Sequence, residues 1–94
     1  MWGTGVVDVA AQCYAESSLR SPLTIREIEF LRHMAANEGA VISKDALLTR
    51  IFGVDYLGDP RALDKMIERL RNKLQRASRF LTTIPRQGIV YSRG

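Results

Sequence analysis

The chain has 94 residues, which gives room for one hydrophobic core but not for a core and a deep enclosed active site. With 46% hydrophobic and 26% charged residues, its composition is that of an ordinary globular protein and excludes disorder for most of the chain. The net charge of +4 favours polyanionic partners, either nucleic acid or an anionic membrane surface.

We expect one domain over residues 1–94, in which residues 1–5 are disordered or appended sequence. Short strands are predicted over residues 6–9 and 12–15, which are rich in β-branched and aromatic residues. Residues 17–18 and the pair Ser21-Pro22 have turn composition. The sequence therefore predicts a small antiparallel meander before the first helix.

Two helices follow the meander. Thr24 is a good N-cap, and Glu27 three residues later completes a capping box for a helix that we expect to end at Gly39. Ser43 is the expected N-cap of a second helix, which runs from Lys44 to about Phe52 and ends at Gly53.

A third helix and a hairpin complete the chain. Asp59 is the predicted N-cap and Pro60 the first helical residue, and the helix should run to about Ala77. Residues 80–84 and 89–92 have strand composition, and the segment between them has turn composition, which predicts a C-terminal β-hairpin.

The third helix carries the excess charge. From Pro60 to Arg79 there are seven basic residues and two acidic ones, Asp64 and Glu68, so this segment has a net charge of +5 and the rest of the chain sums to −1. Helical periodicity places an apolar stripe on one side and a mostly basic face on the other. The stripe consists of Leu63, Ile67, Leu70 and Leu74, with Met66 at its edge, and the opposite face consists of Arg61, Lys65, Asn72 and Arg76, with Glu68 beside them.

This basic helix suggests DNA binding. A helix about 10–12 Å across fits the major groove of B-DNA, where Arg and Lys reach phosphates and guanine edges. The charge alone is also consistent with a helix face that is merely solvated, or with one that binds an acidic protein or a membrane. Because the apolar side has no aromatic anchor and is needed for the core, a membrane partner is not expected.

Catalysis and metal binding have little support. A single cysteine, Cys13, and a single histidine, His33, exclude an intramolecular disulfide and leave the usual zinc-ligand and Cys/His nucleophile sets incomplete. We expect no enzyme, no metal and no cofactor. No apolar run is long enough for a membrane span or a signal peptide, and the cysteine usage fits a reducing compartment, so we expect a cytoplasmic location.

Four motifs in this order resemble a known family. They are residues 23–31 (Leu-Thr-x-x-Glu-x-x-x-Leu), residues 42–53 (Ile-Ser-Lys-x-x-Leu-Leu, then Ile-Phe-Gly), residues 61–74 (Arg-x-Leu-Asp-x-x-Ile-x-Arg-Leu-Arg-x-Lys-Leu), and Thr83-Ile84-Pro85 with Gly88. Together they resemble the winged-helix DNA-binding (effector) domain of OmpR/PhoB-type response regulators, a family that belongs to two-component systems. The resemblance covers about Val6 to Arg93.

The resemblance implies an α+β winged helix-turn-helix fold: a small N-terminal antiparallel sheet, three helices and a C-terminal β-hairpin wing. Residues 60–77 would be the recognition helix in the major groove, and the wing (residues 83–91) would lie at the adjacent minor groove. By motif position, Arg61, Arg69 and Arg71 would contact DNA, Lys65 would face base edges and Thr83 would contact phosphate. With the face and flanks of the helix and the wing turn, the expected DNA-binding residues are Arg61, Lys65, Arg69, Arg71, Asn72, Lys73, Arg76, Thr83 and Arg86.

The resemblance also implies partners. Double-stranded DNA would be bound as direct repeats by head-to-tail dimers. The loop after the second helix would face RNA polymerase in this family, through Phe52, Val54, Asp55 and Tyr56. The family's receiver domain needs roughly 100 further residues, so the phosphorylated aspartate is not expected among these 94 residues.

Three positions depart from the family pattern. Glu68 stands where many members have a basic or small polar residue, and it would either repel phosphate or accept from a cytosine amino group. Arg86 replaces a common glycine in the wing turn, and Ile89 replaces the usual aromatic residue after Gly88. A winged-helix module that binds an acidic protein or a polymerase subunit therefore stays open as the alternative function.

Overall fold

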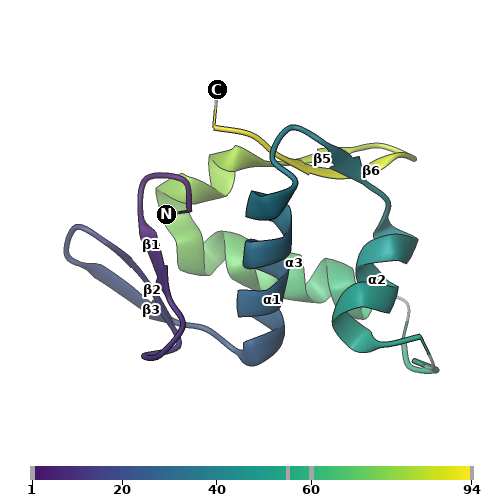
Figure 1. Cartoon of the computed structure of the whole chain (residues 1–94), viewed down its shortest axis with the longest axis horizontal. Coiled ribbons are helices and arrows are strands. Elements are labelled where there is room, and N and C mark those ends of the chain that lie inside the picture. The colour runs from purple at the N-terminus through teal and green to yellow at the C-terminus, as the bar shows by residue number, and fades with distance from the viewer. Residues whose placement is uncertain (1, 55, 60, 94) are drawn as a thin grey trace.

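The computed structural model describes residues 2–54, 56–59 and 61–93. A three-stranded sheet lies at one end of the molecule, the helices fill the middle, and a second three-stranded sheet runs along one side (Figure 1). In chain order the elements are β1 (Val6–Asp8), β2 (Cys13–Glu16), β3 (Leu19–Pro22), α1 (Ile25–Ala36), β4 (Val41–Ile42), α2 (Lys44–Phe52), α3 (Ala62–Leu74), the 3₁₀ helix η1 (Gln75–Phe80), β5 (Leu81–Ile84) and β6 (Gly88–Tyr91).

The N-terminal sheet is an antiparallel meander in the order β1-β2-β3, as the sequence predicts, with one strand more than expected. Ser21 and Pro22, which have turn composition, belong to β3, where they pair with Tyr14 and Cys13 of β2. The turn prediction was wrong because Ser21 is buried and its hydroxyl donates to the Lys73 carbonyl at 2.8 Å, a long-range contact that extends the strand.

Helix α1 begins at the predicted capping box. The N–H of Glu27 donates to Oγ1 of Thr24 at 3.1 Å, and Oε1 of Glu27 accepts from the N–H of Thr24 at 2.8 Å. The helix ends at Ala36, three residues before the predicted C-cap Gly39. The reason is Asn37, whose side-chain amide donates to the His33 carbonyl at 2.9 Å and whose backbone N–H donates to the Met34 carbonyl at 3.2 Å. These bonds satisfy the last carbonyls of the helix before Gly39 is reached.

Helix α2 has the predicted ends. Oγ of Ser43 accepts from the N–H of Ala46 at 3.1 Å, and the N–H of Gly53 donates to the Thr49 carbonyl at 2.9 Å.

Helix α3 is shorter than predicted at both ends. It begins at Ala62 with Arg61 as N-cap, so Asp59 is not the N-cap, and Pro60 lies outside the described residues. Oδ1 of Asp59 instead accepts from the N–H of Arg61 at 2.9 Å, a local turn that delays the start of the helix. The helix ends at Leu74 because Gln75 has φ +51°, which a right-handed helix cannot contain, and η1 continues the chain to Phe80.

The predicted hairpin is present, and one strand joins it that the sequence did not indicate. Strand β4 has only two residues, too few for a periodic pattern, and it pairs with β6 so that the sheet order is β4-β6-β5. This short strand connects the hairpin to the start of α2.

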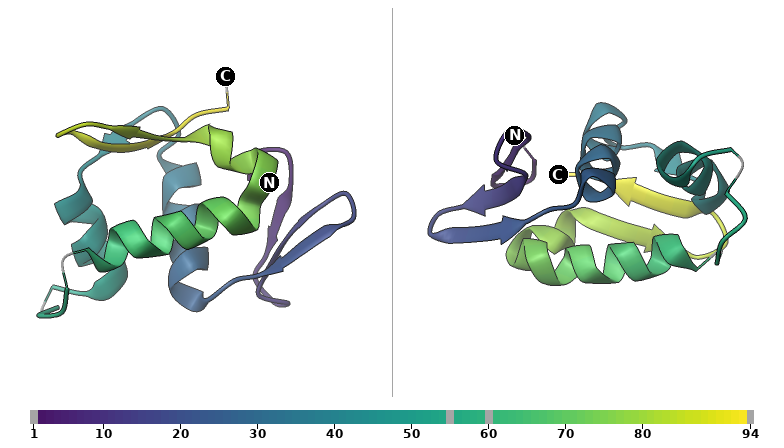
Figure 2. Two further views of the ribbon diagram at one scale, coloured as in Figure 1. Left: turned by 180° about the vertical axis from the view of Figure 1, so that it is seen from behind. Right: turned by 90° about the horizontal axis from the view of Figure 1, so that it is seen from below.

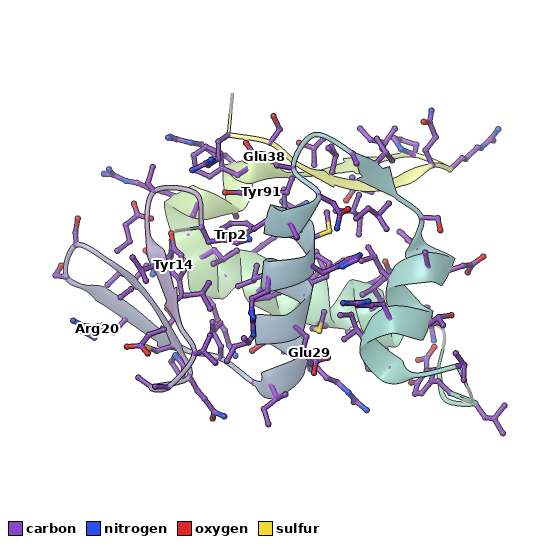
Figure 3. All side chains as sticks on the ribbon, viewed as in Figure 1. Trp2, Tyr14, Arg20, Glu29, Glu38 and Tyr91 are labelled. Atoms are coloured by element: carbon purple, nitrogen blue, oxygen red, sulfur yellow. The ribbon has the colours of Figure 1, made fainter. Side chains whose placement is uncertain are left out.

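The core lies between the helices and both sheets, and Trp2 is part of it. The Trp2 side chain is only 2% exposed, its ring stacks on Tyr91 with centroids 4.4 Å apart, and its Nε1 donates to the Leu31 carbonyl at 2.8 Å (Figure 3). The N–H of Gly3 donates to the Tyr91 hydroxyl at 2.6 Å. The expectation of disorder is therefore wrong for residues 2–5, because an indole with a satisfied N–H fills the core.

We expect Trp2→Ala to lower the free energy of unfolding by about 3–5 kcal/mol, since it removes a buried aromatic side chain and leaves a cavity. Urea unfolding followed by circular dichroism measures the change. Leu57→Ala is the matched control: Leu57 is 98% exposed, and its truncation should change stability by less than about 0.5 kcal/mol. Equal stability of the Trp2 variant and the wild type would contradict this packing.

Candidate nucleic-acid interface

Helix α3 separates its apolar and charged residues as the sequence predicts. Leu63, Met66, Ile67, Leu70 and Leu74 are buried. In the left view of Figure 2, which is turned by 180° from Figure 1, α3 lies nearest the viewer and the hairpin of β5 and β6 runs along the upper edge. The hairpin that carries the wing (residues 83–91) is therefore visible beside α3 from this side of the molecule.

The amino-terminal end of this face is organised by Asp59. Its carboxylate pairs with Nε of Arg61 at 3.5 Å and with Nζ of Lys65 at 3.3 Å. The backbone N–H of Arg61 and, after it, the Lys65 ammonium lower the pKa of Asp59. All three side chains are largely exposed, so these pairs contribute little to stability and can exchange for pairs with an external anion.

Four residues on the rest of α3 and on η1 project into solvent: Glu68, Arg69, Asn72 and Arg76. Within the described part of the chain, none of these four side chains makes a hydrogen bond or an ion pair. Their nitrogen donors and carboxylate oxygens are therefore available to a bound molecule.

Two further predicted DNA-binding residues, Lys73 and Arg71, have partners within the domain. Nζ of Lys73 donates to Oε1 of Glu27 at 2.7 Å, and Glu27 is 2% exposed while the Lys73 side chain is 29% exposed. Nη1 of Arg71 donates to the Ser78 carbonyl at 3.2 Å. These bonds tie α3 to α1 and to η1, so both cations serve the domain's own packing, a role that the sequence pattern did not indicate.

The other acidic residue on α3 also has a partner. Oδ1 of Asp64 pairs with Nζ of Lys44 at 2.9 Å, which connects α3 to the first residue of α2. Lys44 was not predicted as a site residue. The family motif at residues 42–48 contains it, but the sequence gives no sign of which α3 residue it contacts.

The wing places its turn beside the start of α2. A surface hollow of about 270 Å³ is lined by the N-cap Ser43, by Lys44 and Asp45 of α2 and by residues 83–88 of the wing. Thr83 and Arg86 are exposed there, as predicted. Gly88 must be glycine, because φ is +148° and a Cβ would lie 2.0 Å from the Ile42 carbonyl oxygen.

Arg86, at the tip of the wing, has φ +65°. This left-handed backbone conformation favours glycine over residues with a side chain. The conformation explains why glycine is common at this position of the turn, and the arginine retains it at some cost in stability.

The predicted polymerase-facing loop has an aromatic base and exposed apolar residues. The rings of Phe52 and Tyr56 lie 5.1 Å apart, and the Arg26 guanidinium stacks 4.4 Å above Phe52. Val54 is 82% exposed, while Asp55 lies outside the described residues. Leu57, the most exposed apolar residue described, was not among the predicted residues.

No described helix is long and apolar enough to cross a membrane. Among the residues that the structure describes, no group of three His, Cys, Asp or Glu side chains could hold a metal ion.

Three helices followed by a β-hairpin beside an exposed basic helix define a winged helix-turn-helix domain. A family model described as "Transcriptional regulatory protein, C terminal" matches residues 19–91, and the chain belongs to this family. The predicted identity as a winged-helix effector domain of the OmpR/PhoB type is confirmed.

The chain is similar to parts of longer regulators. It is 32% identical over 69 residues to the sensory transduction protein RegX3 of Mycobacterium leprae, a match that covers 73% of this chain and 35% of RegX3. It is 38% identical over 60 residues to the response regulator SaeR of Staphylococcus epidermidis, covering 64% of this chain and 26% of SaeR. The chain thus spans about a third or less of the curated relatives that it matches.

The fold is also that of a solved DNA complex. The DNA-binding domain of RstA from Klebsiella pneumoniae, solved with the RstA box, superposes with a TM-score of 0.78 at 25% identity. That match covers 100% of this chain and 96% of the RstA chain.

We expect Lys73→Ala to lower the free energy of unfolding by about 1–3 kcal/mol, because it leaves the buried Glu27 carboxylate without its cation. Lys65→Ala is the matched control on the same helix. It breaks an exposed pair and should change stability by less than about 1 kcal/mol. Equal losses for the two variants in thermal or urea unfolding would contradict a structural role for Lys73.

Proposed function

We propose that this domain binds specific sequences of double-stranded DNA and thereby regulates transcription, with α3 in the major groove and the wing at the adjacent minor groove. One observation carries the proposal: Arg69 on α3 and Arg76 on η1 are exposed and form no ion pair within the described part of the chain, next to a projecting hairpin, in a domain of a transcription-regulator family.

The charge and shape of this side of the molecule suit duplex DNA. Segment 60–79 has a net charge of +5, and within the described residues only Asp64 and Glu68 on α3 are acidic. An α-helix with its side chains is about 10–12 Å wide, which matches a major groove about 12 Å wide. In this placement Arg69, Asn72 and Arg76 would reach base edges or phosphates, and Arg61 and Lys65 would exchange Asp59 for phosphate.

The remaining predicted DNA-binding residues would act in different ways. Thr83 and Arg86 would contact phosphate or the minor groove from the wing. Arg71 keeps donors besides the one that the Ser78 carbonyl accepts, so it can hold η1 and contact phosphate together. Lys73 would have to leave the buried Glu27 to reach DNA, so we assign it mainly to packing.

The loop after α2 suits a protein contact. Val54 and Leu57 are exposed apolar residues that precede and follow Tyr56 in the chain, and the Tyr56 ring lies 5.1 Å from the Phe52 ring. We propose that this loop contacts RNA polymerase once the domain is on DNA, and that two copies bind direct repeats head to tail in the cytoplasm. A module that binds only protein is not favoured, because it leaves the exposed cations Arg69 and Arg76 without an anionic ligand.

The test is selection of bound duplexes from a random pool, followed by affinity measurement on the selected sequence. We expect Arg69→Ala to weaken binding about tenfold, the effect of one lost side-chain contact to a base. With roughly five phosphates neutralised, log K should fall with log salt at a slope of about −4 to −5. Arg32→Ala is the control, since Arg32 lines a hollow on α1 and α2 away from α3. No enriched duplex, or a flat salt response, would sink the proposal.

Arg86→Gly should raise stability and lower affinity together. Glycine removes the strain of a left-handed residue, about 1–2 kcal/mol, but adds about 0.5–1 kcal/mol of chain entropy to the unfolded state. The free energy of unfolding should therefore rise by up to about 1.5 kcal/mol. Loss of one wing cation should weaken DNA binding and reduce the salt slope by about one. Arg86→Lys keeps the charge and the strain, so it should leave stability and DNA affinity nearly unchanged. If the glycine variant bound DNA as tightly as the wild type, the wing would not be part of the DNA interface.

A further inference from the structure

Glu68 is an acidic residue in the middle of a basic surface. It projects from the exposed side of α3, one turn after Lys65 and one turn before Asn72, and it is followed directly by Arg69. The sequence left two readings of this residue, repulsion of phosphate or acceptance from a cytosine amino group. The contacts around α3 distinguish them.

Three acidic residues on or beside α3 have cationic partners. Glu27 binds Lys73, Asp59 binds Arg61 and Lys65, and Asp64 binds Lys44. These carboxylates organise the helix and its neighbours. Glu68 takes no part in this arrangement: in the described part of the chain it forms neither an ion pair nor a hydrogen bond.

The position of Glu68 on the helix decides what it would meet in a major groove. Asp64 and Arg71 lie on the flank of α3 that faces α2 and η1, where Lys44 and the Ser78 carbonyl hold them, and Lys73 lies on the opposite flank against α1. Phosphates line the walls of the groove and would be met first by the flanks. Glu68 and Asn72 lie between the flanks, on the side opposite the buried stripe, so they would face the groove floor, where the base edges are.

A carboxylate can only accept hydrogen bonds, and the groove floor offers it few donors. Cytosine presents its N4 amino group there, adenine presents its N6 amino group beside the N7 acceptor, and guanine and thymine present acceptors, which would repel it. Acceptance from cytosine N4 is the specific contact that glutamate makes in the major groove. The surrounding Lys65 and Arg69 offset the cost of bringing a negative charge near the duplex.

We propose that Glu68 is a specificity-determining residue of this domain and selects a cytosine at one position of its DNA site. The proposal rests on the proposed function, because it assumes that α3 enters the major groove. It assigns to the one unpaired acidic side chain of the helix a role in discrimination between sequences.

The experiment is parallel selection of duplexes from a random pool by the wild type, Glu68→Gln and Glu68→Ala. We expect the wild-type sites to contain one position at which cytosine is preferred by about fivefold or more over the other bases. That preference should disappear in the alanine variant. In the glutamine variant it should shift toward adenine, which glutamine recognises through N6 and N7. Preferences at the other positions should persist.

Glu29→Gln is the matched control, an exposed glutamate on α1 that lines a hollow with Arg32, His33 and Arg50 rather than with α3 residues (Figure 3). Its selected sites should equal those of the wild type. Because the Glu68 side chain has no partner among the described residues, its variants should unfold at the wild-type temperature, which circular dichroism checks.

Two outcomes would overturn the proposal while leaving the function intact. One is that all Glu68 variants select the same sites as the wild type and simply bind every duplex more tightly, which is the behaviour of a residue that only repels phosphate. The other is a wild-type site whose cytosine preference survives in Glu68→Ala. Failure of the wild type to enrich any duplex would instead contradict the proposed function itself.

Discussion

The burial of one apolar stripe on α3 is the interaction on which the rest of the structure depends. Leu63, Leu70 and Leu74 are essentially inaccessible to solvent, and each buried side chain of this kind contributes about 1.5–3 kcal/mol. An exposed ion pair contributes about 0–1 kcal/mol, so the core and not the charges fixes the rotation of the helix about its axis. Once that rotation is fixed, Lys65, Glu68 and Asn72 must face outward. The apolar residues thus determine which polar residues a ligand can meet.

Acidic residues then decide which cations are available on that surface. Counted from the sequence, α3 and its flanks offer seven basic side chains. Glu27 holds Lys73 against α1, and the Ser78 carbonyl takes one donor of Arg71, so these two stabilise the domain. Asp59 holds Arg61 and Lys65 only at the surface, where solvent screens the pairs and an incoming phosphate can compete. The net charge of the segment therefore overstates the number of cations that are free to bind a ligand. A cation paired with a buried carboxylate is not free, whereas a cation paired with an exposed carboxylate can exchange its partner.

Local rules and one periodic pattern predicted most of the fold and which side chains of α3 are exposed. The caps at Thr24 and Ser43, the apolar stripe and the hairpin all follow from residues close together in sequence, and the structure has them. The misses involve distant partners. Ser21 is part of a strand because its hydroxyl bonds the Lys73 carbonyl. Trp2 lies in the core because its ring stacks on Tyr91 and its N–H bonds the Leu31 carbonyl. Lys73 is partly buried because its ammonium pairs with Glu27. Sequence separations of about 29 to 89 residues leave no periodic trace, so no single-sequence pattern could have indicated these contacts.

A domain that needed only tight binding to DNA would gain from a uniformly basic helix. Charge alone, however, raises affinity for every duplex equally, because phosphate contacts carry no sequence information. Discrimination is a difference between affinities, and it grows when a contact is favourable on one sequence and repulsive on the others. A carboxylate on the groove-facing side of α3 does this: near acceptors of guanine or thymine it opposes binding, and near a donor of cytosine it does not. In the proposed DNA complex, the cations at Arg61, Lys65 and Arg69 would supply the general attraction that such a residue reduces. On this view the acidic side chain sets the ratio of affinities for different DNA sequences, and the basic side chains around it set the overall affinity.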